Sequence, residues 1–284
     1  MKRSISPYLL SGPAVLIFLV MLAVPMIMTF ILSFKSFGFY TGVTPDYGWH
    51  NYIEVVTDSY FHEIFFRTYA ISAGVTFLCA LIGVPEAYIL SRMTKAWRSM
   101  CLLAILGPLL ISVIVRTLGW ALLIGNSGVI NDALLLLGVI DEPLKMMYTT
   151  QAIVVALVHV LVPFMVLSVW TTLQKLDPQV ENASISLGAS HFTTMHRIVL
   201  PQIMPGILAG SLIVFALTAS AFATPSILGG RALKVVATTA YDEYLNTLNW
   251  PLGAAIATIL LIANIVVVMS YNKYVERKYA SVFD

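Results

Sequence analysis

The sequence predicts an all-α membrane protein with six transmembrane helices. Of its 284 residues, 59% are hydrophobic and 11% are charged, whereas an ordinary soluble domain has about 25% charged residues. The mean hydropathy is +0.88, and six apolar runs reach the roughly 20 residues needed to cross a bilayer. This composition excludes a soluble enzyme and a disordered chain. A net charge of only +2 also argues against a nucleic-acid-binding surface.

Each apolar run is expected to form one membrane-spanning helix, and the chain from 1 to 284 a single transmembrane domain. The first run is longer than the apolar part of a signal peptide, about 7–15 residues, and no A-x-A cleavage site follows it, so we expect a retained anchor. None of the runs shows the alternating pattern of a membrane barrel strand. The six runs are 8–34, 68–91, 100–124, 151–172, 202–225 and 251–271.

Basic residues predict the orientation of these spans. Of sixteen lysines and arginines, ten lie in segments on the side of the termini, five lie on the opposite side, and Arg116 lies within a span. Because Lys and Arg are enriched in cytoplasmic loops, both termini are expected in the cytoplasm. On the outer side, residues 128–140 predict a short apolar helix with Asn131 as a possible cap, and residues 46–63 predict another short helix.

The loop between the fourth and fifth spans, 173–201, predicts two short cytoplasmic helices. Asp177 followed by Pro178 is typical of a helix start. Gly188 is expected to end the first helix. A second segment is expected over 190–200, ended by Pro201.

The same loop carries a motif. The stretch NASISLGASHFTTMHRIVLP resembles the cytoplasmic motif of the permease subunits of binding-protein-dependent ABC importers, which reads E-A-A, three residues, G, nine residues, I-x-L-P. Gly188, Ile198, Leu200 and Pro201 stand at the motif spacing. Asn182 occupies the usual Glu position, so a glutamate contact would have to come from a shifted residue.

Segments outside the loop resemble the spermidine/putrescine-type branch of this family: VRT at 115–117, GNSGVIN at 125–131, LGVIDEPLKMMYT at 137–149 and NWPLGAA at 249–255. The resemblance implies the type I ABC importer permease (MetI-like) fold in a bacterial inner membrane. It implies the permease subunit of an ATP-driven importer for a small solute such as a polyamine. Amino-acid-like solutes, thiamine, phosphonate and ferric ion are alternatives.

The resemblance also implies partners. The chain has no G-x-x-x-x-G-K-[ST] phosphate-binding motif, so ATP and Mg²⁺ would belong to two copies of a cytoplasmic ATPase. A second, related permease and a periplasmic or secreted binding protein complete the expected assembly, and no cofactor or metal is expected in this chain. The residues expected to contact the ATPase are Glu181, Asn182, Ala183, Ser184, Gly188, Ala189, Ser190, Ile198, Leu200 and Pro201.

Four polar residues lie in or beside the predicted spans and are candidates for a substrate path. Glu86 either pairs with a base such as Arg92, six residues away, or lines a path for a cation. Arg116 either reaches the membrane surface, pairs within the bundle, or lines the path. Ser220 and Thr224 either line that path or bond to backbone carbonyls.

Small residues within the spans, including Gly206 and Gly210, favour close helix packing within the bundle or against another subunit.

Two other functions are possible. A self-contained secondary transporter would carry its own coupling-ion site and often an inverted repeat, which the sequence does not show. A membrane enzyme would need a clustered catalytic set, and His191 and His196 have no nearby Cys or Asp to complete one.

Overall fold

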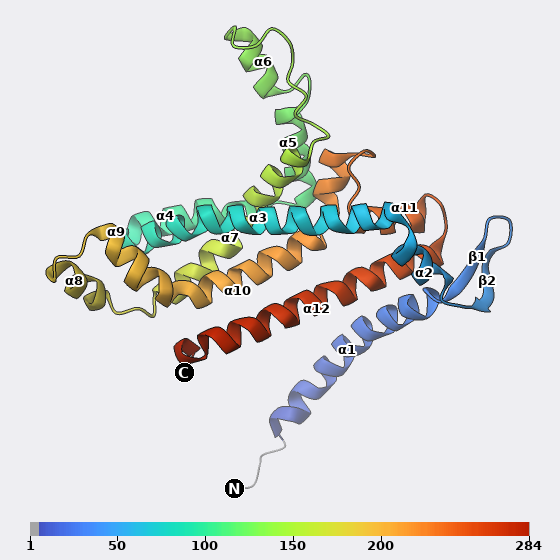
Figure 1. The fold of residues 1–284 in the computed structure, drawn as a ribbon, viewed down its shortest axis with the longest axis horizontal. Helices are drawn as coiled ribbons and strands as arrows, with labels where there is room; N and C mark the ends of the chain where they lie inside the picture. The colour runs from blue at the N-terminus through green and yellow to red at the C-terminus, as the bar shows by residue number, and fades with distance from the viewer. Residues whose placement is uncertain (1–5, 284) are drawn as a thin grey trace. The chain divides into compact units, whose positions relative to one another are not determined.

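The computed structural model describes residues 6–283, which are almost entirely helical (Figure 1). Six helical segments of this range are long and apolar enough to cross a membrane, in agreement with the predicted number. They are Gly12–Leu32, Ser59–Arg92, Val113–Leu136, Thr150–Leu173, His191–Ala219 and Trp250–Lys273. The chain divides into two compact units, one comprising residues up to His62 with Thr239–Ile262, the other Glu63–Thr238 with the residues from Ala263 onward.

The first unit contains the long apolar α1, a two-stranded antiparallel sheet and two short helices. Asn51 fixes the chain after α1, because its buried amide donates to the carbonyls of Ser33 (2.8 Å) and Lys35 (2.9 Å). The short helix predicted within 46–63 is confirmed as α2. The elements are α1 (Ser6–Leu32), β1 (Lys35–Gly38), β2 (Gly42–Tyr47), α2 (His50–Thr57), most of α11 (Val236–Leu245), and the start of α12 (Trp250–Phe283).

Glu54 on α2 gives this unit a pH-dependent stability. Burial raises the pKa of Glu54, the charges of Glu243 and Asp58 raise it further, and His50 lowers it. An acid whose native pKa is raised stabilises the fold at low pH, and this contribution is lost as the pH rises through the native pKa. We therefore expect Glu54→Gln to increase stability at pH 7.

This effect should be less than about 1 kcal/mol, because the carboxyl is largely solvated. It should shrink towards pH 4, where the native carboxyl is protonated. Thermal unfolding in detergent at both pH values measures it. Asp46→Asn, an exposed acid on β2, is the matched control, and equal gains at both pH values would contradict the prediction.

The second unit is built around α7 and α10, which lie side by side and pack against α3 (Figure 1). Its elements are most of α3 (Ser59–Arg92), α4 (Lys95–Leu106), the 3-10 turn η1 (Gly107–Leu110), α5 (Val113–Ile124), α6 (Val129–Leu136), α7 (Thr150–Leu173), α8 (Pro178–Ser186), α9 (His191–Thr194), the π turn η2 (Met195–Val199), α10 (Leu200–Ala219), the π turn η3 (Pro225–Gly229) and the rest of α12 from Ala263 onward.

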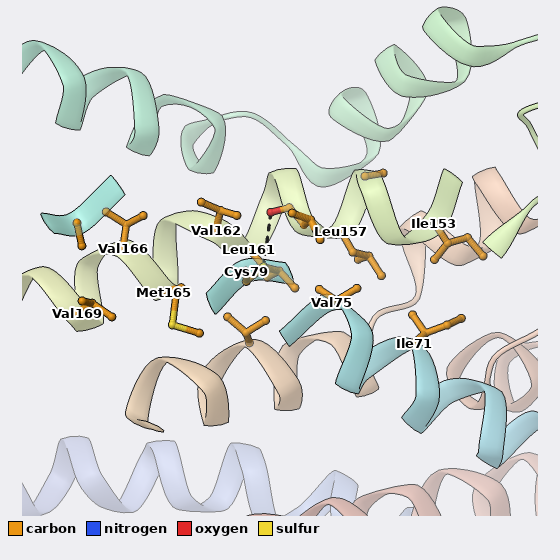
Figure 2. Packing of buried hydrophobic residues seen from close by; sticks show 14 of the residues in the cluster. Ile71, Val75, Cys79, Ile153, Leu157, Leu161, Val162, Met165, Val166 and Val169 are labelled. Carbon is orange, nitrogen blue, oxygen red and sulfur yellow. Dashed lines mark hydrogen bonds between the residues drawn. The ribbon is translucent and has the colours of Figure 1, made fainter. Parts of the chain in front are cut away.

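The core of this unit is a buried apolar layer between α3, α7 and α10. Figure 2 shows Val75 and Cys79 of α3 pointing towards α7, and the Cys79 thiol lies 3.9 Å from the carbonyl oxygen of Val158. Gly206 on α10 permits the close approach to α7, because a Cβ there would lie 2.8 Å from the Ser168 carbonyl oxygen. The Ser168 hydroxyl donates to the Gly206 carbonyl (2.8 Å). The glycines of α10 therefore serve packing within the bundle.

The third predicted span, 100–124, is not one helix. The α-helix ends at Leu106, and the chain is extended at Ile111 before α5 begins. Pro108 has no N–H group to continue the α-helical hydrogen bonds, which favours a break here. The Pro108 carbonyl accepts from the Ile111 N–H at 3.3 Å and also from the guanidinium of Arg116, one turn into α5.

The expected boundary at Pro201 was also wrong. Helix continues from His191 to Ala219, through Pro201, by way of the π turn η2. In that turn the N–H of Leu200 bonds to the Met195 carbonyl five residues back. This wider turn precedes the position where proline would otherwise remove a hydrogen bond and clash with the preceding turn. The fifth span ends at Ala219 rather than 225.

Asn131 is not a helix cap. The short helix predicted within 128–140 is present as α6, which lies inside the candidate span Val113–Leu136, and Gly128 is at its N-cap. Asn131 is fully buried and binds the segment that follows, donating to the carbonyls of Gly125 (2.9 Å) and Leu144 (3.0 Å) and accepting from the Leu144 N–H (2.9 Å). Its role is to close the loop between α6 and α7.

Candidate functional site

The helices α8 and α9 form a corner at one end of the second unit (Figure 1), here called the α8–α9 corner, 177–194. Asp177 starts it as predicted, since its carboxylate accepts from the Gln179 N–H at 2.9 Å. Gly188 ends α8 with φ +88°. The N–H of Gly188 bonds to the Ile185 carbonyl and that of Ala189 to the Ser184 carbonyl. This pair of bonds is the Schellman motif, which favours glycine.

A hydroxyl pair holds the two helices of the corner together. Ser190 begins α9 by accepting from the Thr193 N–H. The hydroxyls of Ser184 and Thr194 lie 3.0 Å apart, and both residues are buried. Ser184, one of the residues expected to contact the ATPase, is therefore directed into the corner rather than towards its surface.

Glu181 links the corner to α3. The Tyr88 hydroxyl donates to Glu181 Oε1 at 2.8 Å, and the Arg92 guanidinium forms an ion pair with Oε2. The guanidinium also lies over the Tyr88 ring, 5.1 Å from its centroid. The Glu181 side chain is only 13% exposed. The structure thus assigns Glu181 an internal partner, where the sequence had suggested a contact with the ATPase.

Of the remaining residues predicted to contact the ATPase, some are exposed on the corner and others are partly buried where it joins the membrane helices. Ile198, Leu200 and Ala189 are partly buried at the root of the corner. On the surface lie Asn182, Ala183, Gly188, Ser190 and Pro201.

Sequence reasoning missed two residues of this surface. The Leu187 side chain is 89% exposed and that of Phe192 is 80% exposed, on either side of Gly188. The Phe192 ring stacks on His196, with 4° between the ring planes. Leu187 and Phe192 are the most exposed large apolar residues of the corner, ahead of Val180 and Ile185. Large apolar residues in a loop are the signal that could have identified them, since exposed apolar groups gather at interaction surfaces.

The four polar candidates of the membrane region have different hydrogen-bond partners. Arg116 is 9% exposed and pairs within its own unit, with the Pro108 carbonyl. The buried Thr224 hydroxyl lies 3.2 Å from that of Thr117. Ser220 is exposed and donates to the Ala216 carbonyl at 2.8 Å.

Glu86 does not form the pairing considered for it, since Arg92 is bonded to Glu181. One Glu86 carboxylate oxygen is buried with no hydrogen-bond partner among the described residues. Within the same part of the chain, no group of three or more His, Cys, Asp or Glu could hold a metal ion.

Comparison with known proteins identifies the family. Residues 7–281 match the family described as the binding-protein-dependent transport system inner membrane component. The chain belongs to this family. The permease is 31% identical over 219 residues to the spermidine/putrescine transport system permease protein PotB of Haemophilus influenzae, covering 76% of this chain and 77% of the relative. It is 31% identical over 233 residues to PotB of Escherichia coli, covering 80% of this chain and 84% of the relative.

A solved structure of the same fold is that of a bacterial alginate ABC transporter in complex with an alginate pentasaccharide-bound periplasmic protein. It matches with a TM-score of 0.82 at 18% identity, over 97% of this chain and 96% of that one. The predicted ABC importer permease fold is confirmed.

The permease is therefore a transport component of a binding-protein-dependent ABC importer, not an enzyme, and a multi-pass protein of a bacterial inner membrane. Its partners are of the general kinds that such an importer uses, a substrate-binding protein and an ATPase. Membership of this family rejects the self-contained secondary transporter considered from the sequence.

Proposed function

We propose that the permease binds its ATPase through the α8–α9 corner. The observation that carries this proposal is the capped corner that exposes Leu187 and Phe192 beside the small residues Ala183, Gly188 and Ser190. Apolar side chains can enter a groove of the partner, and small residues let the backbone approach it closely. ATP and Mg²⁺ would be held by the ATPase, because this chain lacks the phosphate-binding motif.

The corner is attached to three membrane helices, so a movement of the bound ATPase would be transmitted to those helices. It is continuous with α7 through the chain before Asp177 and with α10 through η2, and Glu181 ties it to α3. When the ATPase closes on ATP, the corner would move and these helices would tilt with it. Such rigid-body motion between two states is the basis of alternating access.

We further propose that the imported solute is a polyamine. Relatives named as spermidine/putrescine permeases match at 31% identity over about four fifths of this chain. The expected assembly has a second permease, two ATPase subunits and a periplasmic binding protein. The prediction that both termini lie in the cytoplasm agrees with the proposal, because the corner lies on the same side of the membrane as the termini when six spans are counted.

Reconstitution in proteoliposomes tests both proposals. The permease, co-expressed with its cognate second permease and ATPase, should take up radiolabelled putrescine or spermidine only with ATP and the loaded binding protein. Uptake by this chain alone, without an ATPase, would overturn the coupling proposal. ATP-driven uptake of other solutes but not of polyamines would overturn the substrate proposal and leave the coupling proposal standing.

A further inference from the structure

Glu86 is an acid in an apolar part of α3, within the candidate span Ser59–Arg92. One oxygen of its carboxylate is buried, and no described residue donates a hydrogen bond to it. A buried polar atom without a partner destabilises a protein, and an ionisable group inside a membrane is rare unless it serves a function. Packing alone therefore does not explain why an acid occupies this position.

Glu86 lines a cavity of about 420 Å³, here called the Glu86 cavity. This volume lies within the range of small-molecule sites, about 300–1,000 Å³. The cavity wall is mostly aliphatic, and its polar side chains besides Glu86 are Trp120 and His159. The Trp120 indole N–H donates to His159 Nδ1 at 3.2 Å, so these two rings fix one another.

The charges around the cavity are distributed unevenly. Arg116 donates to the carbonyl of Pro108, which lines the wall. Positive charge is therefore already present on the Pro108 side. The carboxylate of Glu86 is the acceptor in the cavity that a positively charged donor would satisfy.

We infer that the Glu86 cavity is a binding station within the membrane for an aliphatic primary ammonium ion. The ammonium group would bond to the Glu86 carboxylate, and the methylene chain would lie against the aliphatic wall. Trp120 adds an aromatic surface that attracts cations. This inference rests on the proposed polyamine import and names the residue that would hold the amine during transit. A station on a transport path must bind weakly enough to release its solute.

The first test is uptake by the complete importer in proteoliposomes, with radiolabelled putrescine as the probe. Glu86→Gln should lower the uptake rate about tenfold, because it removes a hydrogen bond to a charged group. ATP hydrolysis stimulated by the loaded binding protein should stay within about twofold, because the corner is unchanged. Glu86→Asp, which keeps the charge, should recover part of the uptake. Glu63→Gln, the same change at an exposed position of α3, is the matched control.

The second test measures binding directly and does not depend on transport. The purified complex of both permeases and the ATPase is unfolded thermally with 1,4-diaminobutane or with the neutral 1,4-butanediol. The diamine, but not the diol, should raise the unfolding temperature of the wild-type and Glu63→Gln complexes. Glu86→Gln should lose this shift.

These outcomes separate the station from the proposed function. Wild-type uptake and a wild-type diamine shift in Glu86→Gln would overturn the station and leave polyamine import standing. A diamine shift that depends on Glu86 in an importer that does not transport polyamines would support the station and overturn the proposed substrate. An equal shift with diamine and diol would also overturn the station, because the site would then not recognise charge.

Discussion

An arginine in place of Gly188 is expected to abolish binding of the ATPase while the membrane helices remain folded. Gly188 has φ +88°, a left-handed conformation that costs a residue with a side chain about 1–2 kcal/mol. A Cβ at this position would meet no atom within 4 Å, so strain is the whole cost of a small side chain. Arginine adds a long charged group between the exposed Leu187 and Phe192, where we propose that the ATPase binds.

Two further variants distinguish the effect of backbone strain at position 188 from the effect of a large side chain on the proposed binding surface. Gly188→Ala should weaken binding of the ATPase moderately, and Gly188→Asn less, since asparagine tolerates the left-handed region. Co-purification of the ATPase and ATP-driven uptake measure the series, with thermal unfolding of the permease as the check on folding. Stoichiometric ATPase and normal uptake with Gly188→Arg would show that the corner is not the docking site.

Charge reversal of Arg92 is expected to uncouple ATP hydrolysis from uptake. Arg92→Glu would place a second carboxylate against Glu181, whose side chain is 13% exposed, whereas that of Arg92 is 45% exposed. A hydrogen bond to a charged group contributes about 1.5–3 kcal/mol, reduced here by solvent around the arginine. The corner would still bind the ATPase, but α3 would no longer follow it. Uptake per ATP hydrolysed should therefore fall about tenfold.

The double variant Arg92→Glu with Glu181→Arg is the decisive control, because it restores opposite charges across the same pair. It should recover much of the uptake lost by either single reversal. Tyr88→Phe, which removes only the hydroxyl bonded to Glu181, should have a smaller effect. The ratio of solute transported to ATP hydrolysed in proteoliposomes measures all four variants. An unchanged ratio in the single reversals would contradict a coupling role for this link.

Features set by neighbouring residues could be predicted from the sequence. Asp177 caps α8 and Gly188 ends it through bonds that span only a few residues. The partner of Glu181 could not be predicted, because Tyr88 is 93 residues away and is brought near only by helix packing. Likewise, the hydropathy of the third apolar run predicted its length but not the break in the helix near Pro108. The π turn that accommodates Pro201 could not be predicted either, because it depends on backbone geometry rather than on composition.

Helix continues from His191 to Ala219 through the π turn η2, so no loop separates the end of the corner from the following span. Each residue of an α-helix turns about 100° around the axis and advances about 1.5 Å. Adding or removing one residue between Phe192 and the core residues of α10 would therefore rotate the surface that we propose binds the ATPase out of its position. Sequences of this segment should vary in residue type far more readily than in length.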